Sequence, residues 1–313
     1  MKRGIFAAFV LAVMACPVMK VQAEDRNNTT VVQASAETVM TMRVRGEIMI
    51  GSDGLVKSHR IETQVDPKIA EFVDKTIAGW KFQPFVKDGV PIVLRGKFQM
   101  TLGARAKDAD NYVISVDNAR FNEISTSSMQ DVMQRAADLG KDGKLKCENT
   151  GCLVSQPRSP VYPTALVQAG VSGSVMTHLY VNPNGTVADA VVAQSTLYNV
   201  RGDGKTLDDA RKQLEEVALK FVRGVKFSPG SGAKLGDDDH FAIAFPIEFH
   251  IQGAMLNNEG VWRLEQRSRR NVASWLVRNP DRWIGVSDVA GSVVMPMIDS
   301  KIKLVSDKGS AAP

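Results

Sequence analysis

The residues of this chain that could do chemistry include two cysteines five positions apart. Cys147 and Cys152 flank the turn-forming residues Asn149 and Gly151 in the segment KCENTGC. In the chain-entropy model, a disulfide that closes so small a ring stabilises a fold by about 2 kcal/mol. Metal binding is the alternative, but closed zinc sites use four ligands, and no histidine lies nearby. The spacing therefore predicts a structural disulfide between Cys147 and Cys152, which fits an oxidising compartment.

Catalytic motifs are scarce. The sequence holds no Gly-x-Ser-x-Gly, no His-Glu-x-x-His and no phosphate-binding loop. The run DDDH at residues 237–240, with the loop 200–206, could serve a hydrolase or a metal-dependent enzyme, but four polar residues leading into a strand are typical of a solvated turn. His59, His178 and His250 fall in strand patterns and are interpreted as sheet residues. We expect no enzyme, catalytic residue, metal or cofactor, and the enzyme stays as an alternative.

The first 23 residues predict a cleaved secretory signal peptide. Lys2 and Arg3 precede an apolar run at residues 4–19, and small residues around Ala23 offer a cleavage site. The run of 16 residues is shorter than the ~20 needed to span a bilayer. Two alternatives stay open: an uncleaved inner-membrane anchor, and a lipoprotein attached through Cys16, which ends the lipobox-like segment VMAC.

Charge gives no support for a nucleic-acid partner. The whole chain of 313 residues carries a net charge of +5, and cleavage after Ala23 removes Lys2, Arg3 and Lys20 but no acid. The remaining excess of positive charge is small, so the basic pI is mainly a property of the signal peptide. The length is enough for about two domains.

Residues 38–103 follow the order strand, strand, helix, strand. A tight turn at residues 52–54 joins the first two strands. Asp66 can cap the helix, Pro67 suits its first turn, and the segment WKFQP at residues 80–84 ends it. The last strand, LRGKFQMTL, alternates apolar and polar residues. The apolar face of the helix is expected to comprise Ile69, Phe72, Val73, Thr76, Ile77 and Trp80.

Residues 155–252 repeat that order. The turn NPNG at residues 182–185 joins two strands, Thr206 can cap the helix, and VKFSP at residues 225–229 ends it. The stretch from the turn to the end of the helix is about 14 residues longer here than in residues 38–103. We expect the additional residues to form a surface loop around residues 197–206. In the last strand, Pro246 lies on the outer face and predicts an edge strand or a bulge. The buried helix face is expected to comprise Leu207, Ala210, Leu214, Val217, Phe221 and Val225.

The second pattern resembles the C-terminal domain of the TonB energy transducers. It shares with that family a Pro-x-Tyr-Pro at residues 160–163, a short helix closing near Gly170, a turn glycine at Gly185, Lys-Phe-x-Pro at residues 226–229 and a final alternating strand. Residues 38–103 resemble the same domain more loosely, as a degenerate copy that lacks the Tyr-Pro. The resemblance implies an α+β fold of two units in the periplasm, each a small antiparallel sheet with a helix packed on one face.

The resemblance also implies a function. TonB transducers bind the TonB box of outer-membrane receptors as an added strand on a sheet edge, so we expect a protein-binding module with such a receptor or another envelope protein as partner. An alternative is a membrane-anchored transducer for receptor-mediated transport, although the Pro-rich spacer of that family is missing and Ser159 replaces its Gln. A homodimer is also open. The partner-binding residues that the resemblance implies are Ser159, Pro160, Tyr162, Pro163, Phe245, Ile247 and Phe249.

Two segments lie outside the repeated pattern. Residues 112–145 predict a connector made of a strand and a helix, with Ser128 as cap and Gly140 as terminator. Residues 253–313 form a basic, Trp-containing extension with a disordered tail from residue 306. Within it, residues 262–283 are interpreted either as a basic amphipathic helix that contacts a membrane surface or a partner, or as a terminal helix whose Trp275 and Leu276 dock onto the sheet while its arginines stay in water.

Overall fold

The computed structural model describes residues 37–109, 111–123, 152–155, 159–228, 234–235, 238–251, 258–276, 295–296 and 304–307. The chain from Gln33 to Pro313 forms one compact unit. Its described residues build a mostly antiparallel sheet with few helices, which confirms the α+β class. The predicted signal peptide, Cys147 and the helix predicted at residues 128–140 lie outside the described residues, so the disulfide to Cys152 stays a prediction.

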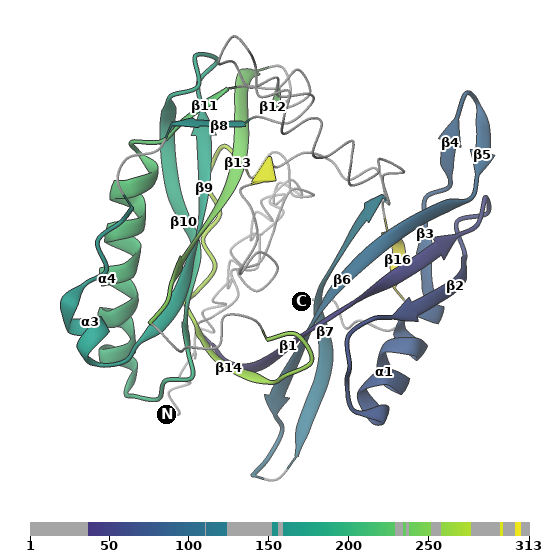
Figure 1. Ribbon diagram of the computed structural model, residues 1–313, viewed down its shortest axis with the longest axis horizontal. Helices are drawn as coiled ribbons and strands as arrows, with labels where there is room; N and C mark the ends of the chain where they lie inside the picture. The colour runs from purple at the N-terminus through teal and green to yellow at the C-terminus, as the bar shows by residue number, and fades with distance from the viewer. Residues whose placement is uncertain are drawn as a thin grey trace, which may run out of the picture. The chain divides into compact units, whose positions relative to one another are not determined.

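One ten-stranded sheet contains most of the strands (Figure 1). Every strand pair in it is antiparallel. Along its main path, neighbouring strands are β12 (Lys234–Leu235), β13 (Asp238–Phe249), β9 (Ser172–Val181), β10 (Val187–Tyr198), β14 (Arg263–Arg267), β1 (Glu37–Ile50), β6 (Leu94–Ala106) and β7 (Tyr112–Glu123). Off this path, β2 (Val56–Ile61) pairs with β1, and β15 (Met295–Pro296) pairs with β13.

In the N-terminal half, the β1–β2 hairpin and the following helix confirm the sequence prediction. Helix α1 (Pro67–Ala78) begins where the Asp66 side chain accepts a hydrogen bond from the amide of Lys68. The helix is shorter than predicted, because the chain turns at Gly79 and Trp80 belongs to a strand, β3 (Trp80–Phe82). Trp80 is buried all the same, since it packs edge to face against three phenylalanine rings.

In the C-terminal half, a short helix α3 (Thr164–Gln168) precedes the β9–β10 hairpin, and a long helix α4 (Gly204–Val222) follows it. The cap of α4 is Asp203, not Thr206 as predicted: Asp203 accepts from the amide and the hydroxyl of Thr206. After the helix, β11 (Lys226–Ser228) pairs with β8 (Cys152–Ser155).

The extra length of this half does not form the predicted surface loop. Five residues connect strand to helix in both halves. Instead, β10 has 12 residues where β2 has 6, and α4 has 19 where α1 has 12. The additional residues therefore extend a strand and the helix that packs on it.

The repeated Lys-Phe dipeptides make the same contact in both halves. The amide of Phe82 donates to the carbonyl of Gly54 at 2.8 Å, and the amide of Phe227 donates to the carbonyl of Gly185 at the same distance. Both glycines have positive φ, +77° and +85°. The short strand after each helix thus runs back along the hairpin turn that precedes the helix, which explains why both segments carry a buried phenylalanine at this position.

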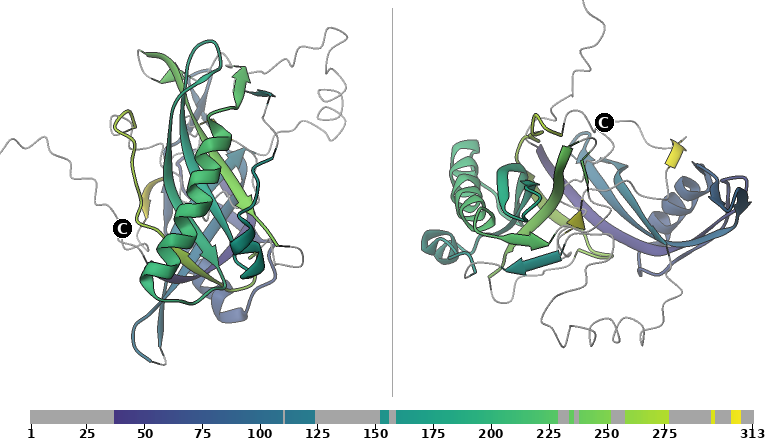
Figure 2. Two further views of the ribbon diagram at one scale, coloured as in Figure 1. Left: turned by 90° about the vertical axis from the view of Figure 1, so that its left-hand side faces the viewer. Right: turned by 90° about the horizontal axis from the view of Figure 1, so that it is seen from above.

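Both helices lie on one face of the sheet. Helix α4 covers β9, β10 and β13 over an apolar core that includes Leu179, Leu214 and Phe245, and α1 covers β1 and β6 over a second core (Figure 2). The register between the halves places Leu197, Gln266 and Thr38 in one row across β10, β14 and β1. Because side chains alternate along each strand, the neighbours of these three residues point to the opposite face.

The C-terminal extension departs most from the prediction. Residues 263–267 form strand β14 inside the sheet, not a helix, and Arg263 and Arg267 are buried, not in water. Trp275 and Leu276 do dock onto the sheet as predicted, where the Trp275 indole stacks on Tyr180 and donates to Asp189. The predicted disordered tail is also wrong at its start, because β16 (Leu304–Asp307) pairs with β3.

We expect the turn glycine Gly185 to be irreplaceable for a reason beyond its backbone angle. A Cβ at Gly185 would lie 1.7 Å from the carbonyl oxygen of Phe227, so Gly185→Ala should lower the free energy of unfolding by about 3 kcal/mol or more. Gly89, with φ of +80° and nothing within 4 Å of a built Cβ, is the matched control. Gly89→Ala should cost only about 1 kcal/mol in urea unfolding, and equal losses in the two variants would contradict the prediction.

Candidate functional site

The strand predicted to bind a partner, β13, has one open stretch of edge. Its inner side pairs with β9 along residues 241–249. Its outer side pairs with β12 near residues 238–241 and with β15 at Ile243 and Ala244. In the part of the chain that the structure describes, no strand pairs with the outer side of residues 245–249. This agrees with the edge position predicted from Pro246, which has no amide to donate to a ladder.

The predicted contact side chains of β13 point away from a partner. Phe245, Ile247 and Phe249 are at most 6% exposed and belong to the core under α4. A partner that pairs with this edge would therefore meet the backbone of β13, while these three side chains hold the strand in place. Residues of the opposite face, such as Ala244, are buried beneath the segment that carries Leu276.

The Pro-x-Tyr-Pro segment lies at the end of the same strand. The ring of Tyr162 packs on Phe249 with centroids 5.4 Å apart, and its hydroxyl donates to the carbonyl of Val171. Burial raises the pKa of Tyr162, so the ring stays neutral and acts as a spacer between α3 and the sheet. Pro163 is the residue before the first turn of α3, and Ser159 is exposed. The structure thus joins Tyr162 to the predicted edge.

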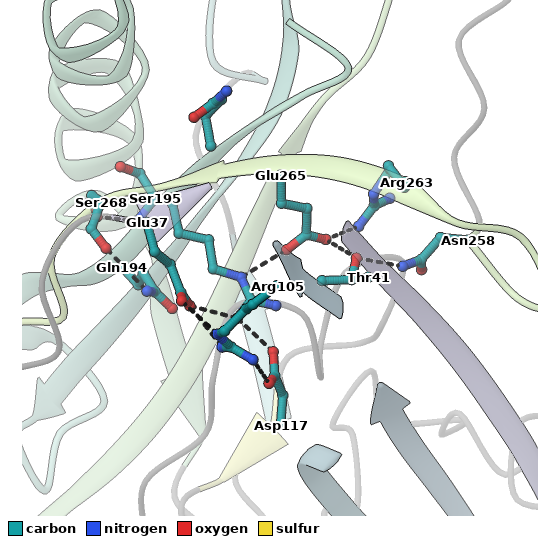
Figure 3. Close-up of polar contacts among 12 residues, drawn as sticks. Glu37, Thr41, Arg105, Asp117, Gln194, Ser195, Asn258, Arg263, Glu265 and Ser268 are labelled. Atoms are coloured by element: carbon teal, nitrogen blue, oxygen red, sulfur yellow. Dashed lines mark hydrogen bonds and ion pairs between the residues drawn. The ribbon is translucent and has the colours of Figure 1, made fainter. Parts of the chain in front are cut away.

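A second polar site, which the sequence analysis missed, lies on the face opposite the helices. Strand β14 presents Arg263 and Glu265 there (Figure 3), together with Arg267, and each of the three side chains is at most 1% exposed. The Glu265 carboxylate accepts from Arg263 Nη2 at 2.7 Å, from Arg267 Nε at 2.9 Å and from the Thr41 hydroxyl at 2.8 Å. Both arginines therefore share one buried carboxylate.

Further charges extend this cluster across neighbouring strands. Arg267 Nη1 lies 3.2 Å from Glu37 of β1 and 2.8 Å from Asp117 of β7. Arg105 of β6 contacts the same two carboxylates at 3.0 and 2.7 Å. The charge cluster, defined as Glu37, Arg105, Asp117, Arg263, Glu265 and Arg267, thus connects β14 to β1, β6 and β7.

Electrostatics fixes the protonation states in the cluster. Burial alone would raise the pKa of Glu265, but Arg267, Arg263 and the hydrogen bonds from Arg263 and Thr41 outweigh it and lower that pKa to about 2. Burial would lower the pKa of Arg267, and the carboxylates of Glu265 and Asp117 raise it instead. Arg263 also lies over the ring of Tyr198, 3.7 Å from its centroid, and burial raises the pKa of that phenol. Glu265 and the two arginines that contact it are therefore all charged at neutral pH.

Of the three histidines interpreted as sheet residues, His59 and His178 lie in strands, and His250 lies just outside one. His178 on β9 is 2% exposed, and burial lowers its pKa to about 4, so it is neutral at physiological pH. His59 on β2 lies 2.7 Å from Asp74 of α1, and His250 follows β13. His240 belongs to β13 instead of the solvated turn predicted for residues 237–240; it stacks on Tyr180 and lies 3.0 Å from Asn182.

Within the described residues, no group of three or more His, Cys, Asp or Glu side chains could hold a metal ion. None of the helices described is both long and apolar enough to cross a bilayer. The charge cluster could have been found from the period-two run RLEQR at residues 263–267, which places three charges on one face of a strand. The arginine-rich composition of residues 262–283 is compatible with a helix, but the alternation at residues 263–267 is typical of a strand.

Comparison of the chain with protein-family models, with curated proteins and with solved structures finds no match.

We expect the charge cluster to be critical for stability. Arg267→Met removes the partner of three carboxylates, and breaking a buried ion pair on one side typically costs about 3–5 kcal/mol. The control is Arg45→Met, which breaks the partly exposed pair between Arg45 and Glu259 at 2.7 Å and should cost about 1 kcal/mol or less. Urea unfolding measures both, and equally small losses would contradict the structural role of Arg267.

The cluster also predicts an acid dependence. The pKa of Glu265 is about 2 in the folded chain and ordinarily 4.5, so its stabilisation is complete above pH 4.5 and is lost as pH falls toward 2. Between about pH 6 and pH 3, this group alone should remove about 2 kcal/mol. The measurement is urea unfolding of wild type and of Glu265→Gln at both pH values: the stability gap between them should shrink on acidification, and a constant gap would contradict the prediction.

Proposed function

We propose that the chain is a periplasmic protein-binding module that takes up an extended segment of its partner as an added strand on β13. The observation that carries this proposal is the outer edge of residues 245–249, with which none of the described strands pairs, on a strand whose inner side pairs with β9 along residues 241–249. An exposed sheet edge offers main-chain donors and acceptors to an incoming peptide. The predicted signal peptide at residues 1–23 supports export to the periplasm.

The two halves of the chain support a relationship to the TonB C-terminal domain. In the N-terminal half the strand order is β2, β1, β6, and in the C-terminal half it is β10, β9, β13. Each half has one hairpin, one helix and one returning strand, and each closes with the Phe-to-Gly backbone bond described above. We therefore interpret residues 38–103 and 155–252 as two TonB-C-terminal-like units, of which the second keeps the Tyr-Pro segment.

In the first of these two units, the edge that corresponds to β13 already has a neighbouring strand. Strand β6 occupies in the first unit the place that β13 occupies in the second, and its outer side is paired with β7 over residues 96–106. The chain thus supplies its own added strand to the first unit. The equivalent edge of β13 carries no strand over residues 245–249 among those described, which leaves it for a partner such as the TonB box of an outer-membrane receptor.

The residue types at 245–249 determine which backbone hydrogen bonds this edge can make with a partner strand. Pro is tolerated in a sheet where its nitrogen faces away from the neighbouring strand, so Pro246 presents a carbonyl but no donor on the outer side. Since each backbone hydrogen bond contributes only about 0.5–1.5 kcal/mol net, we expect binding to be weak, with Tyr162 and Phe249 holding the end of the edge rigid.

The test is a titration of isotope-labelled protein with a synthetic TonB-box peptide, followed by NMR. Amide resonances of Phe245, Ile247, Glu248 and Phe249 and the ring resonances of Tyr162 should shift at millimolar peptide, while amides of β7 should not. The matched control is the same peptide methylated on alternate backbone nitrogens, which keeps every side chain and removes ladder donors; it should bind at least about tenfold more weakly.

Two results would overturn the proposal. Equal shifts with the methylated peptide would mean that side chains, and not strand pairing, carry recognition. No shift at residues 245–249 with either peptide would remove β13 as the binding edge.

A further inference from the structure

Strand β13 in the second unit holds the place of β6 in the first, and the strand registers align the two residue by residue. Phe98 of β6 pairs with a residue eight positions before the turn glycine of its hairpin, and Phe245 of β13 pairs with a residue eight positions before the turn glycine of its own. Residues 245–249, with which none of the described strands pairs on the outer side, therefore correspond to residues 98–102.

Strand β7 shows which side chains lie beside residues 98–102 of β6. The pairs across this ladder are Phe98 with Phe121, Met100 with Ala119 and Leu102 with Val116. The three β7 residues are apolar, and each packs, partly buried, against the core that α1 covers. The added strand thus extends the apolar core sideways, and it does so with the side chains of one face.

The side chain of Phe121 contacts two further aromatic rings. Its ring centroid lies 4.9 Å from that of Phe82 and 5.0 Å from that of Trp80, and both pairs meet edge to face. Aromatic pairs in this geometry contribute free energy beyond the burial of their apolar area. Phe121 is therefore the residue that anchors β7 among the aromatic rings of the first unit.

The second unit contains the counterpart of this anchor position. Phe227 corresponds to Phe82, since the amide of each donates to the carbonyl of the turn glycine in its unit, and its ring meets that of Phe245 edge to face at 6.2 Å. The apolar residues at 245–249 are also slightly more exposed than their counterparts beside β7. Phe245, Ile247 and Phe249 are 6%, 6% and 3% exposed, against 2%, 0% and 0% for Phe98, Met100 and Leu102. This agrees with an edge that none of the described strands covers as β7 covers β6.

The strands described on this side of β6 and β13 all run antiparallel to their neighbour. For β7 and β12 the short connection along the chain requires that direction. Strand β15 comes from a distant part of the chain, and it is antiparallel to β13 at Ile243 and Ala244 all the same. Since β13 ends at Phe249, five residues of the edge are left beyond β15, and a strand that continues this ladder is antiparallel as well.

We propose that the partner segment is a five-residue strand, antiparallel to β13, that reads apolar, any residue, apolar, any residue, aromatic. This assignment rests on the proposed function of β13. The aromatic side chain lies opposite Phe245 and beside Phe227, which together form its specificity-determining position. The two apolar side chains lie opposite Ile247 and Phe249, and the residues between them point to the other face.

The experiment is an NMR titration of isotope-labelled protein with the capped peptide SVNARF. Its sequence is that of residues 115–121 without Asp117, the extra residue of a bulge in β7. The matched control is SVNAFR, which has the same composition and turns the aromatic side chain to the opposite face. SVNARF should shift the amides of residues 245–249 that have one, and it should bind about tenfold more tightly than SVNAFR.

A spin label on the N-terminus of SVNARF tests the direction of the strand. It should broaden the amide resonance of Phe249 more than that of Phe245, because the N-terminal end of an antiparallel segment lies opposite Phe249. Neither measurement changes the protein, so a folding defect cannot imitate the result.

The outcomes separate the proposed segment from the proposed function. Equal affinities of SVNARF and SVNAFR, or a spin label that acts most strongly on Phe245, would overturn the segment and leave β13 as the binding edge. Shifts at residues 245–249 with the TonB-box peptide alone would do the same. No shift there with any of the three peptides would remove β13 as the binding edge, and the proposed segment with it.

Discussion

The arrangement of the sheet depends on the burial of Glu265 between two arginines. A buried carboxylate is costly unless opposite charge and hydrogen bonds surround it, and here Arg263, Arg267 and Thr41 all contact it. A slip of β14 by one residue would turn these charges to the face that carries the apolar cores. The charge cluster therefore fixes the register of β14, and β14 is the strand that lies between β10 and β1.

Through β14, a segment near the C-terminus determines how the two halves are joined. The strand pairs with β10 over three residue pairs and with β1 over five, and Arg267 extends the connection to β7 through Asp117. Sheet edges attract further strands, and this chain covers some of its own: β14 lies between the halves, and β7 covers β6. Among the described residues, the outer sides of β2 and β7 carry no strand either, and what distinguishes the proposed binding edge on β13 is that Tyr162 packs at its end.

The proposed function depends on main-chain groups and not on side chains. At β13 the side chains of Phe245, Ile247 and Phe249 are buried, and none of the described strands pairs with the outer side of residues 245–249. Such an edge suits an extended peptide of loosely specified sequence.

Local patterns in the sequence specify most of the elements: the β1–β2 and β9–β10 hairpins, helices α1 and α4, and strands β6, β7 and β13 follow from turn chemistry and from periods of 2 and 3.6, which act within about ten residues. The sequence also predicted the edge position of Pro246, and the family resemblance singled out Tyr162. The place of residues 263–267 in the sheet depends on tertiary contacts, because Glu265 contacts Thr41 across 224 positions of sequence and no local pattern specifies so distant a partner. The same holds for Trp80. A helical period predicted it as the last residue of the helix face, but it lies in β3, where it packs on Phe98 of β6 and Phe121 of β7.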